Sequence, residues 1–376
     1  MRPLKILNQM GSMRNISVAG SILAPVIDNR FVPYPYLMIW VVTRRCNARC
    51  QMCSIWHEKD SPFLAPEQIE SAFAKNDLSF VRSLTLTGGE PTLRNDLPEL
   101  FMIALRHMPN LELAALATSG LNTRRTIDYV GEMLETLHSK PNKIYRFDVQ
   151  ISLDGVGEVH DQVRGIDGFF DNVQKTISGL HKLQERYPKL NLKFSSVLMP
   201  QNLPHVQELQ EFAKSEALPI FFSPVVMSGE YYNNLHGLID LKFSAKEHQQ
   251  MAHDFFSELG DKDQTVYRYY YQDMAEMVQG AKRRRRCMMG YLGFVMEHTG
   301  NIYPCVNCEG KTFGNLLSQS FEEIWFGAKS ENVRTELRQF CCPTCTSMCF
   351  PPPANAAEVV DLAIRKLGKG MQTSGD

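Results

Sequence analysis

The sequence carries almost no net charge, since 40 Lys and Arg residues face 41 Asp and Glu residues and the formal charge at pH 7 is −1. Nucleic-acid binding relies on a concentrated cationic surface, so this balance argues against nucleic acid as the main partner. The chain also lacks an apolar run of about 18 residues that could span a membrane. It shows no apolar segment followed by the small-residue cleavage site of a signal peptide. We therefore expect a cytoplasmic protein without a transmembrane segment.

Cysteine is distributed unevenly along the chain. Ten cysteines occur among 376 residues, three of them within residues 46–53 and seven within residues 287–349. In the cytosol such thiols are more often metal ligands or reactive groups than disulfides. The remaining composition, 44% hydrophobic and 22% charged, is ordinary for a soluble globular protein. The length suits one large domain and a smaller one.

Short apolar segments alternate with amphipathic segments between residues 36 and 226. The first, 36–43 (YLMIWVVT), is almost continuously apolar, which is typical of a strand buried on both faces. The predicted strands are 36–43, 83–87, 112–118, 148–153, 191–198 and 219–226, and the predicted helices are 97–107, 125–138, 170–187 and 205–216. This alternation indicates parallel, right-handed β/α units. We predict an α/β protein with a partial (β/α)6 TIM-like barrel, open at its side to a large substrate.

The first predicted strand leads into three cysteines with the spacing C-x3-C-x2-C, namely Cys46, Cys50 and Cys53. Active sites of β/α barrels lie at the carboxyl ends of the strands, where this segment is expected. Three thiolates can hold three corners of a [4Fe–4S] cube and leave one iron open, because full ligation by the protein takes four. A zinc site that His57 completes is the alternative, since structural zinc needs a fourth Cys or His.

With the hydrophobic Met52 before its last cysteine, this motif resembles the signature of the radical S-adenosylmethionine (SAM) enzymes. In that family SAM binds the open iron, and an electron from the cluster splits it to give a 5′-deoxyadenosyl radical, so the cofactor supplies the difficult chemistry. After the second predicted strand comes a segment that resembles the family's GGEP motif, which holds the SAM α-ammonium. The resemblance assigns Gly88, Gly89, Glu90 and Pro91 to SAM binding.

Further segments resemble the same family after the third, fourth and fifth predicted strands. Thr118 begins a Thr-Ser-Gly segment similar to the T-N-G motif, with Ser119 in place of Asn. The S-L-D-G segment at 152–155, followed by H-D and R-G pairs, resembles a run found in family members with a C-terminal extension. The planar fork of an arginine there suits the carboxylate of SAM. The resemblance implies SAM-binding roles for Thr118, Ser152, Asp154, Arg164 and Asn202.

The C-terminal cysteines resemble the SPASM/twitch module, in which a β-hairpin, here about 293–304, positions thiolates for an auxiliary [4Fe–4S] cluster. The implied ligands are Cys287, Cys305 and two of Cys342, Cys345 and Cys349, of which Cys342 and Cys345 are favoured, with Cys308 and Cys341 as bystanders. The full SPASM pattern contains a C-x5-C spacing and a later cysteine that this sequence lacks, so we expect one auxiliary cluster. Zinc is the alternative here too, since thiolate-rich sites also suit it.

The sequence contains two further clusters, one of tyrosines and one of basic residues. Tyr231, Tyr232 and the run at 267–271 could form a cap that faces the substrate, although tyrosines more often pack with a wet tip. The KRRRR run at 282–286 is either a solvated face or a site for an anionic partner.

The predicted parts are a lead-in (1–35), the barrel (36–240), a helical linker or cap (241–280), the cluster module (281–350) and a C-terminal helix and tail (351–376).

The predicted function is that of an enzyme that cleaves SAM reductively and removes hydrogen from a C–H bond, with the auxiliary cluster assisting oxidation. Nothing before the barrel resembles the leader-binding domain of peptide-modifying members, which favours a small polar metabolite such as a sugar, an aminocyclitol or a lipid-linked headgroup. A peptide or protein maturase is the alternative, and a non-catalytic iron–sulfur or zinc scaffold is the alternative of another class. A flavodoxin or ferredoxin would deliver the electron, and the sequence assigns no catalytic acid or base.

Overall fold

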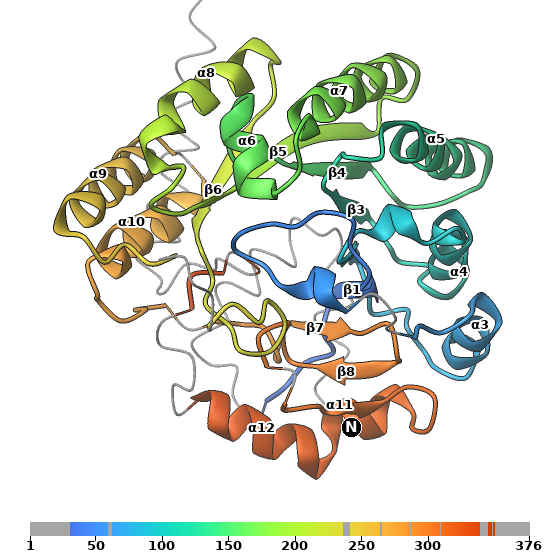
Figure 1. Ribbon diagram of the computed structural model, residues 1–376. Helices are drawn as coiled ribbons and strands as arrows, with labels where there is room; N and C mark the ends of the chain where they lie inside the picture. The colour runs from blue at the N-terminus through green and yellow to red at the C-terminus, as the bar shows by residue number, and fades with distance from the viewer. Residues whose placement is uncertain are drawn as a thin grey trace, which may run out of the picture.

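One curved, nine-stranded sheet organises the chain (Figure 1). The computed structural model describes residues 31–58, 62–235, 241–263, 265–285, 287–308, 310–338, 345–347 and 349. The strand order is β6-β5-β4-β3-β2-β1-β7-β8-β9, parallel from β6 to β7 and antiparallel from β7 to β9. The strands are β1 (Leu37–Thr43), β2 (Ser83–Gly88), β3 (Leu113–Thr118), β4 (Arg146–Ser152), β5 (Leu190–Leu198), β6 (Ile220–Pro224), β7 (Gly293–Met296), β8 (Asn301–Tyr303) and β9 (Gly314–Asn315).

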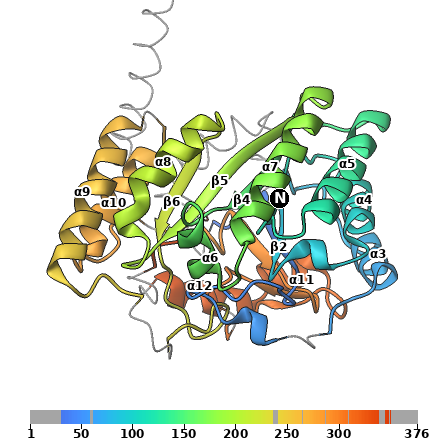
Figure 2. The same cartoon turned by 45° about the horizontal axis from the view of Figure 1, so that its top comes forward.

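Helices cover the convex face of the sheet in an arc, and Figure 2 shows α9 and α10 beside β6, far from α3. They are α3 (Pro66–Ala74), α4 (Leu97–His107), α5 (Thr123–Ser139), α6 (Glu158–Arg164), α7 (Phe169–Arg186), α8 (Val206–Ser215), α9 (Lys246–Lys262), α10 (Tyr267–Val278), α11 (Phe321–Phe326) and α12 (Ala328–Arg338). The predicted fold class, a partial (β/α)6 barrel, is confirmed, and each predicted strand and helix ends within two residues of its place in the structure. No helix in the described ranges has the length and apolar character needed to cross a membrane.

The hairpin expected at 293–304 forms, but the pairing of its first strand was not predicted. β7 lies parallel to β1, with a register that runs from Leu37↔Gly293 to Trp40↔Met296. An unpaired edge at β1 would expose backbone N–H and C=O groups, and β7 satisfies them. The hairpin therefore extends the barrel sheet beyond β1 and covers the edge of that strand.

Burial patterns explain why these strands form and which side chains reach the inside of the barrel. β1 is apolar throughout because it is buried on both faces, and Met38, Trp40 and Val42 are each at most 1% exposed. β5 instead alternates strictly between buried and half-buried positions. Its half-buried residues, which include Lys193 and Ser195, line the cavity inside the barrel. The inner face of β5 is therefore polar.

The tyrosine run predicted as a possible cap lies in α10 and serves mainly as packing. Tyr269, Tyr270 and Tyr271 are buried, and the Tyr270 hydroxyl donates to the Thr346 carbonyl at 2.8 Å. Tyr267 lines the cavity inside the barrel. The run therefore joins the barrel to the C-terminal cysteines and sends one ring into the cavity.

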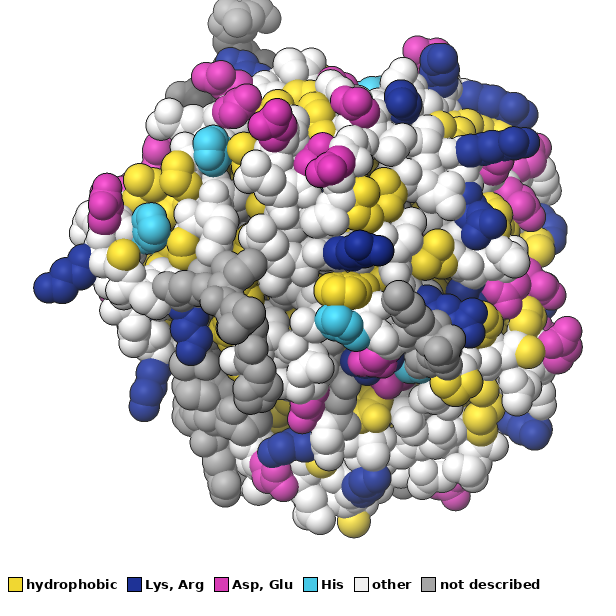
Figure 3. All heavy atoms as spheres, in the orientation of Figure 1, with side chains coloured by type: hydrophobic (Ala, Val, Ile, Leu, Met, Phe, Trp, Pro, Cys, Tyr) yellow, Lys and Arg dark blue, Asp and Glu magenta, His cyan; other side chains and the backbone are white. Residues whose placement is uncertain are grey.

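Three arginines of the basic run, Arg283, Arg284 and Arg285, are engaged by the protein itself. Arg283 donates to the Cys345 carbonyl at 3.4 Å, and the Arg284 Nη2 lies 3.2 Å from the Glu276 carboxylate. Arg285 pairs with Asp273, which lies on α10 like Glu276. On the face in Figure 3, charged side chains of both signs are interspersed. An anionic partner is therefore not needed to explain this run.

Trp325 on α11 anchors the C-terminal module to the barrel. Its ring is fully buried, stacks on Phe321 with centroids 5.8 Å apart and meets Phe294 of β7 edge-on at 6.1 Å. The Nε1 hydrogen bonds to the Pro33 carbonyl at 2.9 Å. Burial of a large aromatic ring with its polar atom satisfied is strongly stabilising.

Replacement of this ring should destabilise the whole chain. We expect Trp325→Ala to cost about 3–5 kcal/mol, since the cavity cannot collapse fully around the missing indole. The melting temperature measured by circular dichroism should fall by at least about 5 °C. Tyr145→Ala is the matched control, because Tyr145 is 47% exposed and its truncation should change stability by under about 0.5 kcal/mol. Equal melting shifts in the two variants would contradict the anchoring role.

Candidate active site

Three thiols lie in the loop that follows β1, at the carboxyl end of the barrel strands. They belong to Cys46, Cys50 and Cys53, and none forms a disulfide. Burial raises the pKa of Cys46 and of Cys53 to about 12, and the neighbouring Cys50 adds to both shifts. Such thiols stay protonated at neutral pH unless a bound cation compensates the thiolate charge. The set therefore suits a metal group that binds all three as thiolates.

The arrangement favours a cluster over a single zinc ion. Within the ranges that the structure describes, no three His, Cys, Asp or Glu side chains converge closely enough to hold one metal ion. His57, the candidate fourth zinc ligand, is exposed and stacks on Trp56 with ring centroids 3.6 Å apart. Three thiols without a fourth protein ligand fit three corners of a [4Fe–4S] cube better than a structural zinc site, which takes four protein ligands.

Backbone hydrogen bonds hold the cysteine loop on two sides. Arg49 N donates to the Arg164 carbonyl at 3.0 Å, which ties the loop to the end of α6. Gly89 N donates to the Thr43 carbonyl at 2.8 Å, which ties it to the segment after β2. A Cβ atom at Gly89 would lie 2.3 Å from the Arg45 carbonyl oxygen, so only glycine permits this approach.

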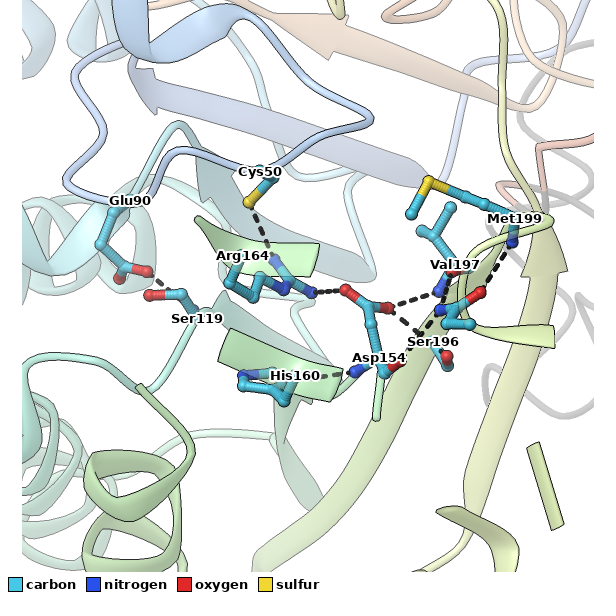
Figure 4. A network of polar contacts seen from close by, with 10 residues as sticks. Cys50, Glu90, Ser119, Asp154, His160, Arg164, Ser196, Val197 and Met199 are labelled. Atoms are coloured by element: carbon cyan, nitrogen blue, oxygen red, sulfur yellow. Dashed lines mark hydrogen bonds and ion pairs between the residues drawn. The ribbon is translucent and has the colours of Figure 1, made fainter. Parts of the chain in front are cut away.

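Glu90 joins the ends of β2 and β3. Its carboxylate is 1% exposed and accepts hydrogen bonds from Thr118 Oγ1 at 2.9 Å and from Ser119 N at 2.7 Å (Figure 4). Thr92 donates to the same carboxylate from both its backbone and its hydroxyl. Pro91, which is also buried, begins the short 3-10 helix η3 (Pro91–Leu93). The predicted SAM-ammonium residues and Thr118 are thus assembled at one place, and their contact with SAM stays a prediction.

Arg164 at the end of α6 points toward the cysteine loop (Figure 4). Its Nη1 donates to Cys50 Sγ at 3.5 Å, and its Nη2 lies 2.6 Å from Asp154 Oδ2. The Nε is buried and has no acceptor among the described residues. An unbonded guanidinium N–H beside the cysteines suits a ligand carboxylate such as that of SAM. Ser152, the other residue expected at this carboxylate or at the ribose, ends β4 opposite Ser195 of β5.

Asp154 and Asn202 lie behind Arg164, and protein groups engage their polar atoms. Asp154 is fully buried and its Oδ1 accepts from Val197 N at 2.7 Å. The Asn202 amide donates to the Asp154 and Val197 carbonyls, both at 2.9 Å. Burial and the Arg164 charge lower the pKa of His160 to about 2, so its neutral ring accepts from Asp154 N. These residues position Arg164, and direct contact of Asp154 or Asn202 with SAM stays a prediction.

A second group of thiols lies in the C-terminal module. Burial raises the pKa of Cys349 to about 11, with the nearby thiols of Cys287 and Cys345 adding to the shift. A hydrogen bond with Cys308, then burial, holds the pKa of Cys305 well above its usual range. Cys308, expected as a bystander, therefore belongs to this group, whereas Cys341 and Cys342 lie outside the described residues.

A cavity of about 390 Å³ inside the barrel is lined by both cysteine-bearing segments. Met52 of the cysteine loop lines it, and so do Cys349 and Val306 of the C-terminal module. Most of the remaining lining comes from the inner faces of the strands and from Tyr231 and Tyr232. A molecule bound in this cavity would therefore contact the cysteine loop at Met52 and the C-terminal module at Cys349.

The segment after β6 connects these parts, and the sequence indicated only its tyrosines. The Tyr231 hydroxyl donates to the Gly88 carbonyl at 2.9 Å, and Ser54 N donates to the Tyr232 carbonyl at 2.8 Å. Asn234 Nδ2 donates to the Met52 carbonyl at 2.8 Å. Asn234 had no motif to mark it, because its role depends on contacts between segments far apart in the sequence.

A methyl group at Gly89 tests whether this close packing forms the site. We expect Gly89→Ala to displace the cysteine loop, because its Cβ would overlap backbone that cannot move aside like a side chain. The iron content after anaerobic reconstitution should fall by about four per chain, the content of one [4Fe–4S] cluster. Gly131→Ala is the control, since a Cβ there meets nothing closer than 3.7 Å. Full iron loading of Gly89→Ala would show that the contact is dispensable.

Comparison with known proteins agrees with this geometry. Residues 40–213 match the radical SAM superfamily, and residues 287–349 match the iron–sulfur cluster-binding SPASM domain. The chain is 32% identical to the Fe-coproporphyrin III synthase of Methanosarcina barkeri over 318 residues, which cover 78% of this chain and 74% of that protein. It is 25% identical to the mycofactocin maturase MftC of Mycolicibacterium smegmatis over 299 residues, or 77% of this chain and 70% of that protein.

A solved structure shows the same fold. Streptococcus suis SuiB bound to S-adenosylmethionine superposes with a TM-score of 0.57 at 13% identity, over 86% of this chain and 73% of that chain. The two family matches, together with the 32% identity to the Fe-coproporphyrin III synthase, carry the assignment further than fold. The chain therefore belongs to the radical SAM superfamily and carries a SPASM iron–sulfur domain, and its cofactors are SAM and [4Fe–4S] clusters.

Proposed function

We propose that this enzyme couples reductive SAM cleavage at the cysteine loop to hydrogen removal from a C–H bond of a substrate in the barrel cavity. The supporting observation is that Met52 of the cysteine loop and Cys349 of the SPASM domain line the same cavity. SAM and its cluster, when bound, would supply a 5′-deoxyadenosyl radical that takes a hydrogen atom from the substrate. Completion of the oxidation would release a proton to solvent and an electron, and the thiols of the C-terminal module would hold the auxiliary cluster that takes up this electron.

The residue roles follow from the placements described above. Cys46, Cys50 and Cys53 would hold the cluster that binds SAM. Gly88, Gly89 and Glu90 would face the SAM amino group, with Arg164 and Ser152 at its carboxylate or ribose. The thiols of Cys287, Cys305, Cys345 and Cys349 would hold one auxiliary cluster, with Cys308 beside it. Arg164 suits its role because its Nη1 lies 3.5 Å from Cys50 Sγ and its buried Nε has no acceptor among the described residues.

The size of the cavity bears on the substrate. Ligand pockets commonly span about 300–1,000 Å³. The predicted SAM-binding residues do not line this cavity of about 390 Å³, so we assign its volume to the substrate. We infer that a substrate too large for it inserts one side chain rather than entering whole. The name of the relative at 32% identity makes a tetrapyrrole the first candidate, and the name of MftC makes a peptide the second. The small polar metabolite favoured by the sequence gains no support from these relatives.

The same chemistry indicates the electron donor and the cellular location of the enzyme. A low-potential donor such as flavodoxin or ferredoxin would reduce the SAM-binding cluster. Reduced thiols persist in the cytoplasm, so we place the enzyme there. Ala48, Met52 and Tyr231 in and beside the cysteine loop are buried, which limits the access of water to a reactive radical there.

SAM cleavage tests radical initiation directly. We expect the reconstituted enzyme to form 5′-deoxyadenosine from SAM and dithionite, as measured by liquid chromatography. The Cys46→Ala/Cys50→Ala/Cys53→Ala variant should form none, because it cannot hold the cluster. A wild-type preparation with about eight irons per chain, as two [4Fe–4S] clusters require, that forms no 5′-deoxyadenosine with or without added substrate would refute the proposal.

Iron counting separates the two cysteine groups. Cys287→Ala/Cys349→Ala should lower the iron content from about eight to about four per chain, since one of two [4Fe–4S] clusters is lost. The triple variant of the cysteine loop should show the same loss, but the electron paramagnetic resonance signal of the reduced protein should come from the other cluster. Unchanged iron in the double variant would remove Cys287 and Cys349 from the ligand set.

The first substrate candidate can be tested by binding alone. Fe-coproporphyrin III should bind the enzyme and shift its Soret absorption band, with a dissociation constant in the micromolar range. The absence of a shift would exclude the tetrapyrrole candidate and retain the peptide. Stimulation of 5′-deoxyadenosine formation by added precursor peptides would then identify the substrate.

A further inference from the structure

A lysine side chain lies inside the barrel, deep in the cavity, and no motif assigns it a role. Lys193 lies on the inner face of β5 and lines the cavity together with Ser195 and Val197. It is two residues before Ser195, so it lies roughly 7 Å deeper along the strand. Met52 and Cys349, which mark the cysteine groups, line the same cavity. Lys193 would therefore face the far end of a ligand that extends from the cysteine segments into the barrel.

The carboxylate in the described lining of the cavity already accepts from three donors. Asp148 on β4 accepts from Lys193 Nζ at 2.9 Å, from Arg146 Nε at 2.8 Å and from Asn191 Nδ2 at 3.0 Å. Asp148 and Lys193 are the charged Asp, Glu, Lys and Arg side chains in that lining. Because Arg146 and Asn191 also donate to Asp148, its negative charge does not depend on Lys193 alone for compensation. Lys193 is therefore the cation that the described lining presents to a ligand.

The ammonium of Lys193 has N–H donors that Asp148 does not use. A lysine ammonium carries three N–H donors, and Asp148 is the one hydrogen-bond acceptor that the described part of the chain offers to Lys193. The Phe221 ring, whose centroid is 5.8 Å from Nζ, covers one side. The remaining donors meet no acceptor among the described residues, and the side chain, which is 21% exposed, has only limited access to bulk water. Such a group gains most from an anionic ligand.

The neighbouring side chains complete a binding site. Gln150 pairs with Lys193 across the β4/β5 ladder, and both it and Ser195 line the cavity without a protein partner among the described residues. Leu37, Ile39 and Leu113 provide apolar walls nearby. A charge-assisted hydrogen bond is stronger in such surroundings than in water.

We propose that Lys193, supported by Gln150 and Ser195, binds a carboxylate of the substrate inside the barrel. This proposal rests on the proposed function and deepens it, since it names the chemical class of the group that enters the lumen. The apolar walls suit the carbon chain or ring that carries the carboxylate. Arg146 and Asn191 keep Asp148 paired, so Lys193 can shift toward the ligand without leaving a bare buried charge.

A pair of probes that differ only in charge tests the site without the substrate. We would titrate the cluster-loaded enzyme with 2-naphthoate and with 2-naphthamide by isothermal calorimetry. The wild type should bind the carboxylate at least about tenfold more tightly than the amide, as a hydrogen bond to a charged group implies. Lys193→Met should reduce this ratio to about one, and Lys193→Arg should retain it because the positive charge remains.

The control is Lys175→Met on α7, which removes an exposed lysine and should leave the ratio unchanged. Equal binding of both probes by the wild type, or no binding of 2-naphthoate at 1 mM or below, would overturn the proposal. So would an unchanged ratio in Lys193→Met. Failure of the wild type to cleave SAM would refute the proposed function but would leave this result standing, because the titration measures binding alone.

Discussion

Parallel pairing on both edges of β1 is the constraint on which the rest of the structure depends. β1 hydrogen-bonds to β2 on one side and to β7 on the other. The loop after β1 carries Cys46–Cys53, and the SPASM cysteines flank the hairpin that begins with β7. Two domains joined only by a linker move relative to each other by default. Here backbone register fixes the spacing of the two thiol groups, so one cavity can serve both.

Buried ion pairs extend this constraint to the loops at the strand ends. Arg44, which is 7% exposed, pairs with Glu297 after β7 and with Glu58 beside the cysteine loop. Arg164 pairs with Asp154 in the same way next to Cys50. Removal of one partner from such a pair leaves an uncompensated buried charge, which is costly. Each pair thus holds a loop in one position, which matters at a site that must align a substrate with SAM.

Local patterns predicted the barrel and the cysteine loop, because the signals lie within single segments. The apolar run of β1 and the spacing of Cys46, Cys50 and Cys53 need no knowledge of distant residues. The pairing of β7 with β1 could not be predicted, since it joins residues about 250 positions apart in the sequence. The alternation of β5 was visible, but which face turned inward depended on its neighbours. For the same reason the basic run looked unpaired until α10 placed Asp273 and Glu276 beside it.

Two cations lie near the proposed reaction path, and this distribution of charge bears on selectivity. Arg164 lies beside Cys50 and has a buried Nε without an acceptor among the described residues, whereas Lys193 lines the cavity deeper in the barrel. On our proposals the first takes the SAM carboxylate and the second takes the substrate carboxylate. A substrate held at Lys193 can react only if its C–H bond lies at the right distance above the carboxylate, below the SAM site. The depth of Lys193 on β5 would then select the length of the substrate between its carboxylate and its reacting C–H bond. A substrate that is too short keeps this bond away from the radical, and one that is too long cannot reach the lysine.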